Sequence, residues 1–386
     1  MDNTAKPAGP PSEGTATSLR DVAHVFLLLG FIGFGGPAAH VALMRREIVQ
    51  RRQWVTEERF LQMFAACNLI PGPSSTELAI YLGYRRAGWR AMVLAGGLFI
   101  LPAMAMMLGI AWAYTRFGTT PAARAILYGV RPVIVAVVLW ALTELARKAL
   151  SRRLLAVVAI AVFALALLNL NPILLLFVAG AGAGLIRLVR DRGSVAPSLV
   201  APLMLGGAWH QVGRLPLLFL TFLKIGAVSF GSGYVLLAFL HADFVHTLHW
   251  LADKQLVDAV AIGQATPGPV FTTATFLGYL FAGVPGALLA TLAIFLPGFL
   301  FVPFLDRLID ATHHRPWMRS LLDAVNAAVL GLIAAVTVTV ARAALTDAVT
   351  IIVALIAFAI LLRRPLASPV LVVAGAVIGL TVKLLV

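Results

Sequence analysis

Two Pro-Gly-Pro triplets stand in otherwise apolar sequence, at Pro71-Gly72-Pro73 and at Pro267-Gly268-Pro269. Proline lacks a backbone N–H and stops a helix, so each triplet ends one helix and leaves free N–H groups on the first turn of the next. Such a helix N-terminus carries about half a positive charge and attracts anions. The triplets therefore predict an anion site at membrane depth.

Hydroxyl and amide side chains flank both triplets, and they can donate hydrogen bonds to the oxygens of a tetrahedral oxyanion. The alternative is that these side chains only cap helix ends at a structural break. Because the break occurs twice, we favour a substrate site. The residues concerned are Asn68, Ser74, Ser75 and Thr76 at the first triplet, and Gln264, Thr266, Thr272, Thr273 and Thr275 at the second.

Lys224 lies deep within an apolar run, where an unpaired lysine costs roughly 2.5 to 3.5 kcal/mol. It therefore needs a negatively charged partner. One candidate partner is a dianionic substrate. The other is Glu77, four residues past Pro73, in a fixed ion pair. Glu77 is also a candidate carrier of a coupling proton, and both interpretations of Lys224 stay open.

The composition predicts an integral membrane protein, because 61% of the 386 residues are hydrophobic and 12% are charged. The net charge of +14 comes from arginines in short loops, which indicates topology signals and not nucleic-acid binding. Residues 1–18 are expected to be a disordered tail without a signal peptide. We expect ten crossings, at 21–44, 91–114, 125–145, 153–170, 172–189, 215–240, 284–305, 320–341, 347–362 and 366–386.

The sequence repeats itself at a spacing of 196 residues, which relates the two triplets and also relates Trp54 to Trp250. The spacing shortens by one residue further along, where Arg131 aligns with Asn326. Two homologous halves follow, at 19–190 and 214–386, joined by a linker at 191–213. Arg131 and Asn326 either line a transport route or, for Arg131, anchor the helix at the interface.

Loop charge predicts how the halves are oriented. Arginines precede the first triplet at 45–59 and follow it at 85–90, so both flanks are expected in the cytoplasm and the segment between them is expected to be re-entrant. The predicted fold is an all-α polytopic membrane protein, an inverted repeat with about five crossings and one re-entrant hairpin in each half. Both termini are then outside. In the rival model the triplet segments cross fully and the halves are parallel.

Small residues interrupt the first helix of each half, at Gly35 and Gly36 and at Gly231 and Ser232. They either allow close helix packing or mark places where the helix unwinds. The histidines lack the spacing of a metal site, so no metal or other cofactor is expected.

Four motifs in order, FGFGGPAAH, NLIPGPSSTELAIYLG, FLKIGAVSFGSGYVLL and AIGQATPGPVFTTATFLGY, make the chain similar to the chromate ion transporter family in its long form. This resemblance covers essentially the whole chain after the tail. It implies export of chromate, with sulfate as an analogue, across a bacterial-type inner membrane, and it implies chromate resistance. Both triplets, Gly35, Gly231 and Lys224 stand where the family pattern has them, whereas Ser232 departs from it.

Three functions are considered. A dianion leaving a negative-inside cell gains roughly 4.6 kcal/mol at 100 mV, which favours an exporter driven by membrane potential and optionally by proton exchange through Glu77. The second candidate is a proton-coupled importer of sulfate or another oxyanion. The third is an intramembrane hydrolase with Ser74 or Ser75 as nucleophile and His40 as base. Expected partners are the oxyanion and membrane lipid, without nucleic acid, and a homodimer is the candidate assembly.

Overall fold

The computed structural model describes residues 19–150, 152–190, 213–230, 233–305, 316–363 and 368–385, and within these ranges all regular secondary structure is helical. The predicted tail at 1–18 and all of the predicted linker but Gly213 lie outside the described residues. The helices up to 190 are α1 Leu19–Ile32, α2 Gly36–Met44, η1 Arg45–Arg51, α3 Glu57–Cys67, α4 Ser74–Phe117, α5 Pro121–Ala149, α6 Arg153–Leu167 and α7 Pro172–Arg190. Those after it are α8 Arg214–Val228, α9 Val235–Leu240, η3 His241–Thr247, α10 Asp253–Ala265, η4 Val270–Thr272, α11 Thr273–Phe301, η5 Val302–Phe304, α13 Pro316–Ala344, α14 Ala348–Arg363 and α15 Ser368–Leu385.

Four helical stretches in the described part are long and apolar enough to span a bilayer. They are Ser74–Phe117, Pro121–Arg147, Val270–Phe304 and Ser320–Ala344. Shorter apolar helices accompany them, among them Arg153–Leu167 and Ala348–Arg363. Large apolar side chains point outward along these helices, for example Ile160 and Leu355. This surface suits lipid, as the composition predicts.

Two of the long helices contain a sharp break near their beginning. In α4 the backbone leaves the helical region at Ala87 and Gly88, and in α11 it does so at Ala282 and Gly283. Both glycines have positive φ, 69° at Gly88 and 62° at Gly283, which a residue with a Cβ adopts only with strain. The part of α4 before its break is about 20 Å long at 1.5 Å per residue, which is a half-length helix.

The first predicted crossing of each half is not a single straight helix. In the second half α8 ends at Val228 and α9 begins only at Val235, and the Arg214 guanidinium lies 5.0 Å from the Trp250 ring centre. The start and the end of this segment therefore lie together. The expected crossing at 215–240 is wrong, because hydropathy counts apolar residues but does not detect a turn in direction.

The corresponding segment of the first half is interrupted in the same way. Helix α1 ends at Ile32, Gly35 adopts a left-handed backbone with φ 101°, and α2 begins at Gly36. Asp21 at the start of α1 acts electrostatically on Arg86, whose guanidinium lies 5.2 Å from the Trp54 ring centre. The break at Gly35 means that the expected crossing at 21–44 is not one continuous helix.

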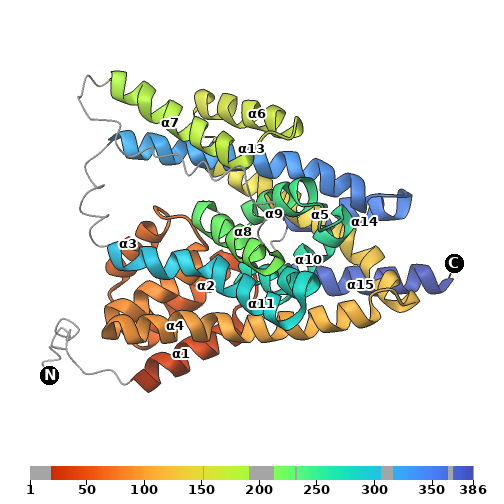
Figure 1. Cartoon of the computed structure of the whole chain (residues 1–386), viewed down its shortest axis with the longest axis horizontal. Coiled ribbons are helices and arrows are strands. Elements are labelled where there is room, and N and C mark those ends of the chain that lie inside the picture. Colours follow the sequence, from red (N-terminus) through yellow and green to blue (C-terminus); the bar gives the residue numbers. More distant parts are fainter. Residues whose placement is uncertain are drawn as a thin grey trace, which may run out of the picture.

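Helices from the two parts of the chain interlock. Helix α1 packs on α4, α8 packs on α11, and α4 and α11 contact each other. Beyond this centre, α5 packs on α14 and α15 while α13 packs on α6 and α7, as Figure 1 shows. Between α5 and α15 the backbones approach so closely that a Cβ on Gly129 would overlap Gly375 and Gly379.

The meeting of the two ends of segment 214–250 can be tested by labelling. Single cysteines replace Arg214 or His249 in a Cys67→Ala background, and an impermeant maleimide is applied from each side of oriented vesicles. We expect both cysteines to react from the same side, together with a positive control at Thr119, which lines the same cavity as Arg214 and Trp250. Reaction of Arg214→Cys and His249→Cys from opposite sides would show that the segment crosses once.

Candidate functional site

The two Pro-Gly-Pro tips meet the helix breaks of the opposite part of the chain. The Gly72 N–H donates to the Ser229 carbonyl at 2.7 Å, and the Gly268 N–H donates to the Gly33 carbonyl at 2.7 Å. The two bonds are reciprocal, because the spacing of 196 residues relates donor to donor and acceptor to acceptor. An unpaired amide in hydrocarbon costs several kcal/mol. Each break therefore supplies the acceptor that the facing tip needs.

Both tips require glycine at their centre. Gly72 has φ 140° and Gly268 has φ 92°, in the region that favours residues without a Cβ. A Cβ on Gly72 would also overlap the Glu77 carboxyl group, and a Cβ on Gly268 would overlap the Ala103 side chain. Apart from half-buried Pro71, the residues of both triplets are buried.

Glu77 is the buried carboxyl group of the first tip. Its side chain is fully buried, and neither carboxyl oxygen has a hydrogen-bond partner among the described residues. The neighbouring Thr76 hydroxyl is likewise buried and without a partner there. The Glu77 stem also lies against Gly298 of α11. An uncompensated polar cluster of this kind at membrane depth is a feature of ion and proton sites.

His40 connects the first tip to the break after α1. Its Nε2 lies 2.9 Å from the Gly33 carbonyl oxygen, which can only accept, so Nε2 carries the proton. Nδ1 then accepts from the Ser75 hydroxyl at 3.1 Å. Both side chains are buried, and the Gly33 carbonyl also accepts from Gly268. The structure thus brings together the serine and histidine of the hydrolase hypothesis.

At the second tip the hydroxyl protons are used locally. Thr272 donates to the Pro269 carbonyl at 2.7 Å, and Thr273 donates to the Val270 carbonyl at 2.7 Å. Thr275 and Thr291 share a hydrogen bond of 2.7 Å. These hydroxyls therefore stabilise the turn in this conformation, which corresponds to the capping alternative.

The remaining predicted residues differ in their placement. Asn68 is exposed and its amide donates to the Phe64 carbonyl at 3.0 Å, so it caps α3. Gln264 is buried, and the buried Thr266 hydroxyl lies 3.3 Å from the Gly263 carbonyl. Ser74 is buried at the start of α4. Gly231 and Ser232 lie outside the described residues.

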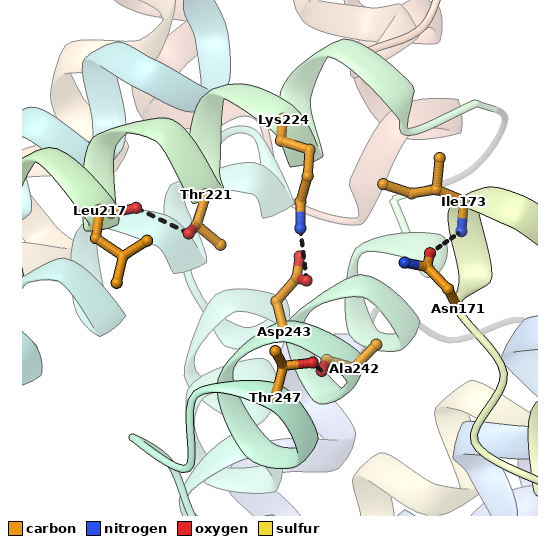
Figure 2. Close-up of polar contacts among 8 residues, drawn as sticks. All are labelled: Asn171, Ile173, Leu217, Thr221, Lys224, Ala242, Asp243 and Thr247. Carbon is orange, nitrogen blue, oxygen red and sulfur yellow. Dashed lines mark hydrogen bonds and ion pairs between the residues drawn. The ribbon is translucent and has the colours of Figure 1, made fainter. Parts of the chain in front are cut away.

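Lys224 is paired with Asp243 and not with Glu77. Its Nζ lies 2.6 Å from Asp243 Oδ1, and Figure 2 shows the lysine of α8 pointing directly at the carboxylate of η3. The predicted ion pair between Lys224 and Glu77 is therefore not formed in this conformation, because Asp243 supplies the negative charge that the lysine needs. The second oxygen of Asp243, Oδ2, is buried without a hydrogen-bond partner in the described part of the chain.

A second charged cluster joins three helices at the edge of a cavity. Arg131 of α5 forms a two-pronged bond with Asp258 of α10, through Nε at 2.7 Å and Nη2 at 2.9 Å. The Tyr114 hydroxyl of α4 donates to the same carboxylate at 2.9 Å. Arg131 lines a cavity of about 870 Å³ together with Arg124, Lys254 and Lys383. Arg131 therefore lines this cavity near the end of α4, whereas its repeat counterpart Asn326 is exposed.

Sequence reasoning missed both acidic partners. Asp258 lies in the apolar stretch that leads to the second triplet, where a lone carboxylate signals a buried cation nearby. Asp243 stands between histidines after an apolar run, and the spacing of 196 relates it to Glu47. Asp243 and Glu47 belong to corresponding π-helical segments, η3 and η1, and a hydropathy pattern does not detect such segments.

The fold and these buried charges describe an all-helical, multi-pass membrane protein. The family model for the chromate transporter matches residues 20–185 and again residues 216–380. The chain belongs to the chromate transporter family. It is a member of a transporter family and not an enzyme, so the His40–Ser75 pair is a structural contact and not a catalytic one.

Curated relatives match along nearly the full length. The chromate transport protein of Cupriavidus metallidurans is 34% identical over 98% of this chain and 96% of its own. The probable chromate transport protein of Synechococcus elongatus is 31% identical over 94% of this chain and 95% of its own. The chromate transport protein of Pseudomonas aeruginosa is 31% identical over 82% of this chain and 80% of its own. No solved structure matches the chain.

Glycine at the first tip can be tested with a matched pair of substitutions. Gly72→Ala forces a Cβ into the left-handed backbone and against Glu77, so we expect it to destabilise the protein by about 2 kcal/mol or more. Gly97→Ala in α4 meets no atom within 4 Å and is expected to be neutral or slightly stabilising. Thermal unfolding in detergent measures both. Equal transition temperatures for the two variants would contradict the left-handed backbone and the close Glu77 contact described for Gly72.

Proposed function

We propose that this protein exports a tetrahedral oxyanion, with chromate as the substrate and sulfate as its analogue, and thereby confers chromate resistance. The observation that carries the proposal is the reciprocal pairing of the two Pro-Gly-Pro tips, Gly72 to Ser229 and Gly268 to Gly33. This pairing holds each tip, and the helix that begins after it, against the helix break of the opposite part of the chain. The names of the full-length relatives supply the expected substrate.

The arrangement of matching residues supports an inverted repeat with a re-entrant hairpin in each half. Trp54 lies beside Arg86, just before the break in α4, whereas Trp250 lines a cavity with Gly118 and Thr119, just after α4 ends. The intervening part of α4 is about 44 Å long. Equivalent residues of the two halves therefore lie at opposite ends of a crossing helix, as in transporters with inverted repeats.

The orientation in the membrane follows from charge. We propose that the face bearing Trp54 and the arginines at 45–59 and 85–90 is cytoplasmic. Because Asp21 acts on Arg86, the start of α1 belongs to this same face. Lys383 near the end of α15 lines the cavity with Arg124, at the other end of α4. The two ends of the described chain are thus proposed on opposite faces, in place of the expectation that both termini lie outside.

The substrate site is proposed at the first turn of α4 and beside Lys224. The N–H groups of Thr76 and Glu77 already bond to the Pro73 carbonyl, and Gly72 donates to Ser229. This leaves the amides of Ser74 and Ser75 as the donors that a helix beginning offers to an anion. Lys224 adds a full positive charge, and the anion would replace Asp243 as its partner. The basic cavity around Arg124 would attract the dianion electrostatically.

Membrane potential is the proposed driving force, since it favours exit of a dianion by roughly 4.6 kcal/mol at 100 mV. The unpartnered Glu77 carboxyl group supports an added proton exchange, and the same feature would serve proton-coupled uptake of sulfate. Export and import of the oxyanion differ in the phenotype that they give the cell. Resistance to chromate accompanies export, whereas growth on limiting sulfate accompanies import.

Lys224 is the first residue to test. The single change would leave Asp243 buried and unpaired, so the informative variant is Lys224→Ala combined with Asp243→Ala, which removes both charges. We expect chromate flux in proteoliposomes to fall about 100-fold, because a charge-assisted contact of about 3 kcal/mol is lost, while thermal stability is kept. Arg153→Ala, which removes an exposed positive charge at the start of α6, is the control. Normal flux in the folded double variant would remove Lys224 from the site.

Glu77 distinguishes the driving forces. In Glu77→Gln the proton-carrying group is lost but the shape is kept, so we expect voltage-driven chromate flux to persist and the response to a pH gradient to disappear. The measurement is flux in proteoliposomes with voltage and pH gradients imposed separately. A Glu77→Gln protein that still responds to the pH gradient would exclude Glu77 as the proton carrier.

A further inference from the structure

In the contact between Lys224 and Asp243, the lysine is a binding group for anions, and the Asp243 carboxylate occupies the position that a free anion could take. The Asp243 carboxylate approaches the ammonium group with Oδ1 at 2.6 Å, while Oδ2 is buried and finds no partner among the described residues. A single contact leaves half of the carboxylate unsatisfied. A dianionic tetrahedral oxyanion has four oxygens and two negative charges. It can therefore accept a hydrogen bond from the Lys224 ammonium group and accept others from further donors at the same time.

A cavity of about 490 Å³ opens beside this contact. Asp243 lines it, together with His241, His246, Asn171 and Arg342. The volume is ample for a tetrahedral ion, and the arginine and the amide are groups that bind oxyanions. Figure 2 shows Asn171 on the same side of Lys224 as the carboxylate. The cavity thus reaches the carboxylate that contacts Lys224, and it does so beside side chains that suit an anion.

The corresponding position of the other half shows what is particular to this contact. Glu47 stands 196 residues before Asp243, also in a π-helical segment, but it pairs with Arg51 at 3.3 Å and Arg52 at 2.9 Å. The counterpart of Lys224 is Leu28. An acidic residue in this segment is therefore shared by both halves, whereas its contact with a half-buried lysine occurs only in the second.

We infer that Asp243 is a tethered competitor for the transported oxyanion at Lys224, and that the cavity of about 490 Å³ is the path by which the oxyanion reaches the lysine. The inference rests on the proposed function. In the empty protein Asp243 neutralises the half-buried lysine, and an arriving dianion displaces it into the cavity. A monovalent anion gains less from the exchange, so the competitor also selects for doubly charged substrates.

This role and a purely structural one predict opposite results. If Asp243 only stabilises the fold, neutralising it weakens the site. If it competes with the substrate, Asp243→Asn frees the lysine and binding of the oxyanion becomes tighter. We expect about tenfold tighter binding of radiolabelled sulfate to the purified full-length protein, which corresponds to about 1.4 kcal/mol. Asp243→Ser, which places a neutral hydroxyl at this position, is a second variant with the same expectation.

Glu47→Gln is the matched control, because it neutralises the equivalent carboxylate without touching Lys224, and its sulfate affinity is expected to equal that of the unmodified protein. Unchanged or weaker sulfate binding in folded Asp243→Asn and Asp243→Ser proteins would overturn the competitor role of Asp243. Equal tightening in Glu47→Gln would do the same, since it would reveal a general effect of charge. Chromate flux is measured separately. Absent flux in the unmodified protein with tighter binding in Asp243→Asn overturns the transport proposal alone.

Discussion

Backbone polarity at membrane depth is the constraint on which the structure depends. Four helix interruptions lie in the apolar interior, and each exposes amides or carbonyls that lipid cannot satisfy. The breaks at Gly33 and Ser229 supply carbonyl oxygens, and the tips at Gly72 and Gly268 supply N–H groups, each to the opposite part of the chain. Neither pair of interruptions could persist without the other. The interlocked packing of α5 with α14 and α15, and of α13 with α6 and α7, surrounds this centre.

Once the backbone is paired, the remaining polar groups have distinct roles. His40 is hydrogen-bonded to both the Gly33 carbonyl and the Ser75 hydroxyl, and so it links these two groups. The threonines of the second tip donate hydrogen bonds to carbonyl groups within the same turn. These groups hold the geometry. Lys224, Asp243 and Glu77 differ, because Asp243 pairs with the lysine through one oxygen only and the Glu77 carboxyl group has no partner among the described residues. Ionisable groups at membrane depth commonly bind or carry ions in membrane proteins. The division between the two sets supports a site built in rigid surroundings from a few exchangeable charges.

Much of this could be predicted from the sequence, and the rest could not for identifiable reasons. The triplets predicted the interruptions at residues 71 and 267, because proline and glycine act locally. The crossing expected at 215–240 was wrong and the one expected at 21–44 is interrupted at Gly35, since an apolar run has the same hydropathy whether its helix continues or breaks. Asp243 as the partner of Lys224 was missed because the pair forms between elements that only the tertiary packing brings together. The family resemblance was confirmed by the two matches to the chromate transporter model.

The central claim is that a tetrahedral dianion binds at the first turn of α4, beside Lys224. Selenate has the same shape and charge as chromate, and its selenium can be located by anomalous scattering. Crystals of the full-length protein grown with selenate are predicted to show an anomalous peak within hydrogen-bonding distance of the Lys224 ammonium group and near the first turn of α4. Selenium peaks confined to the surface, with the Lys224–Asp243 contact intact at saturating selenate, would contradict the account.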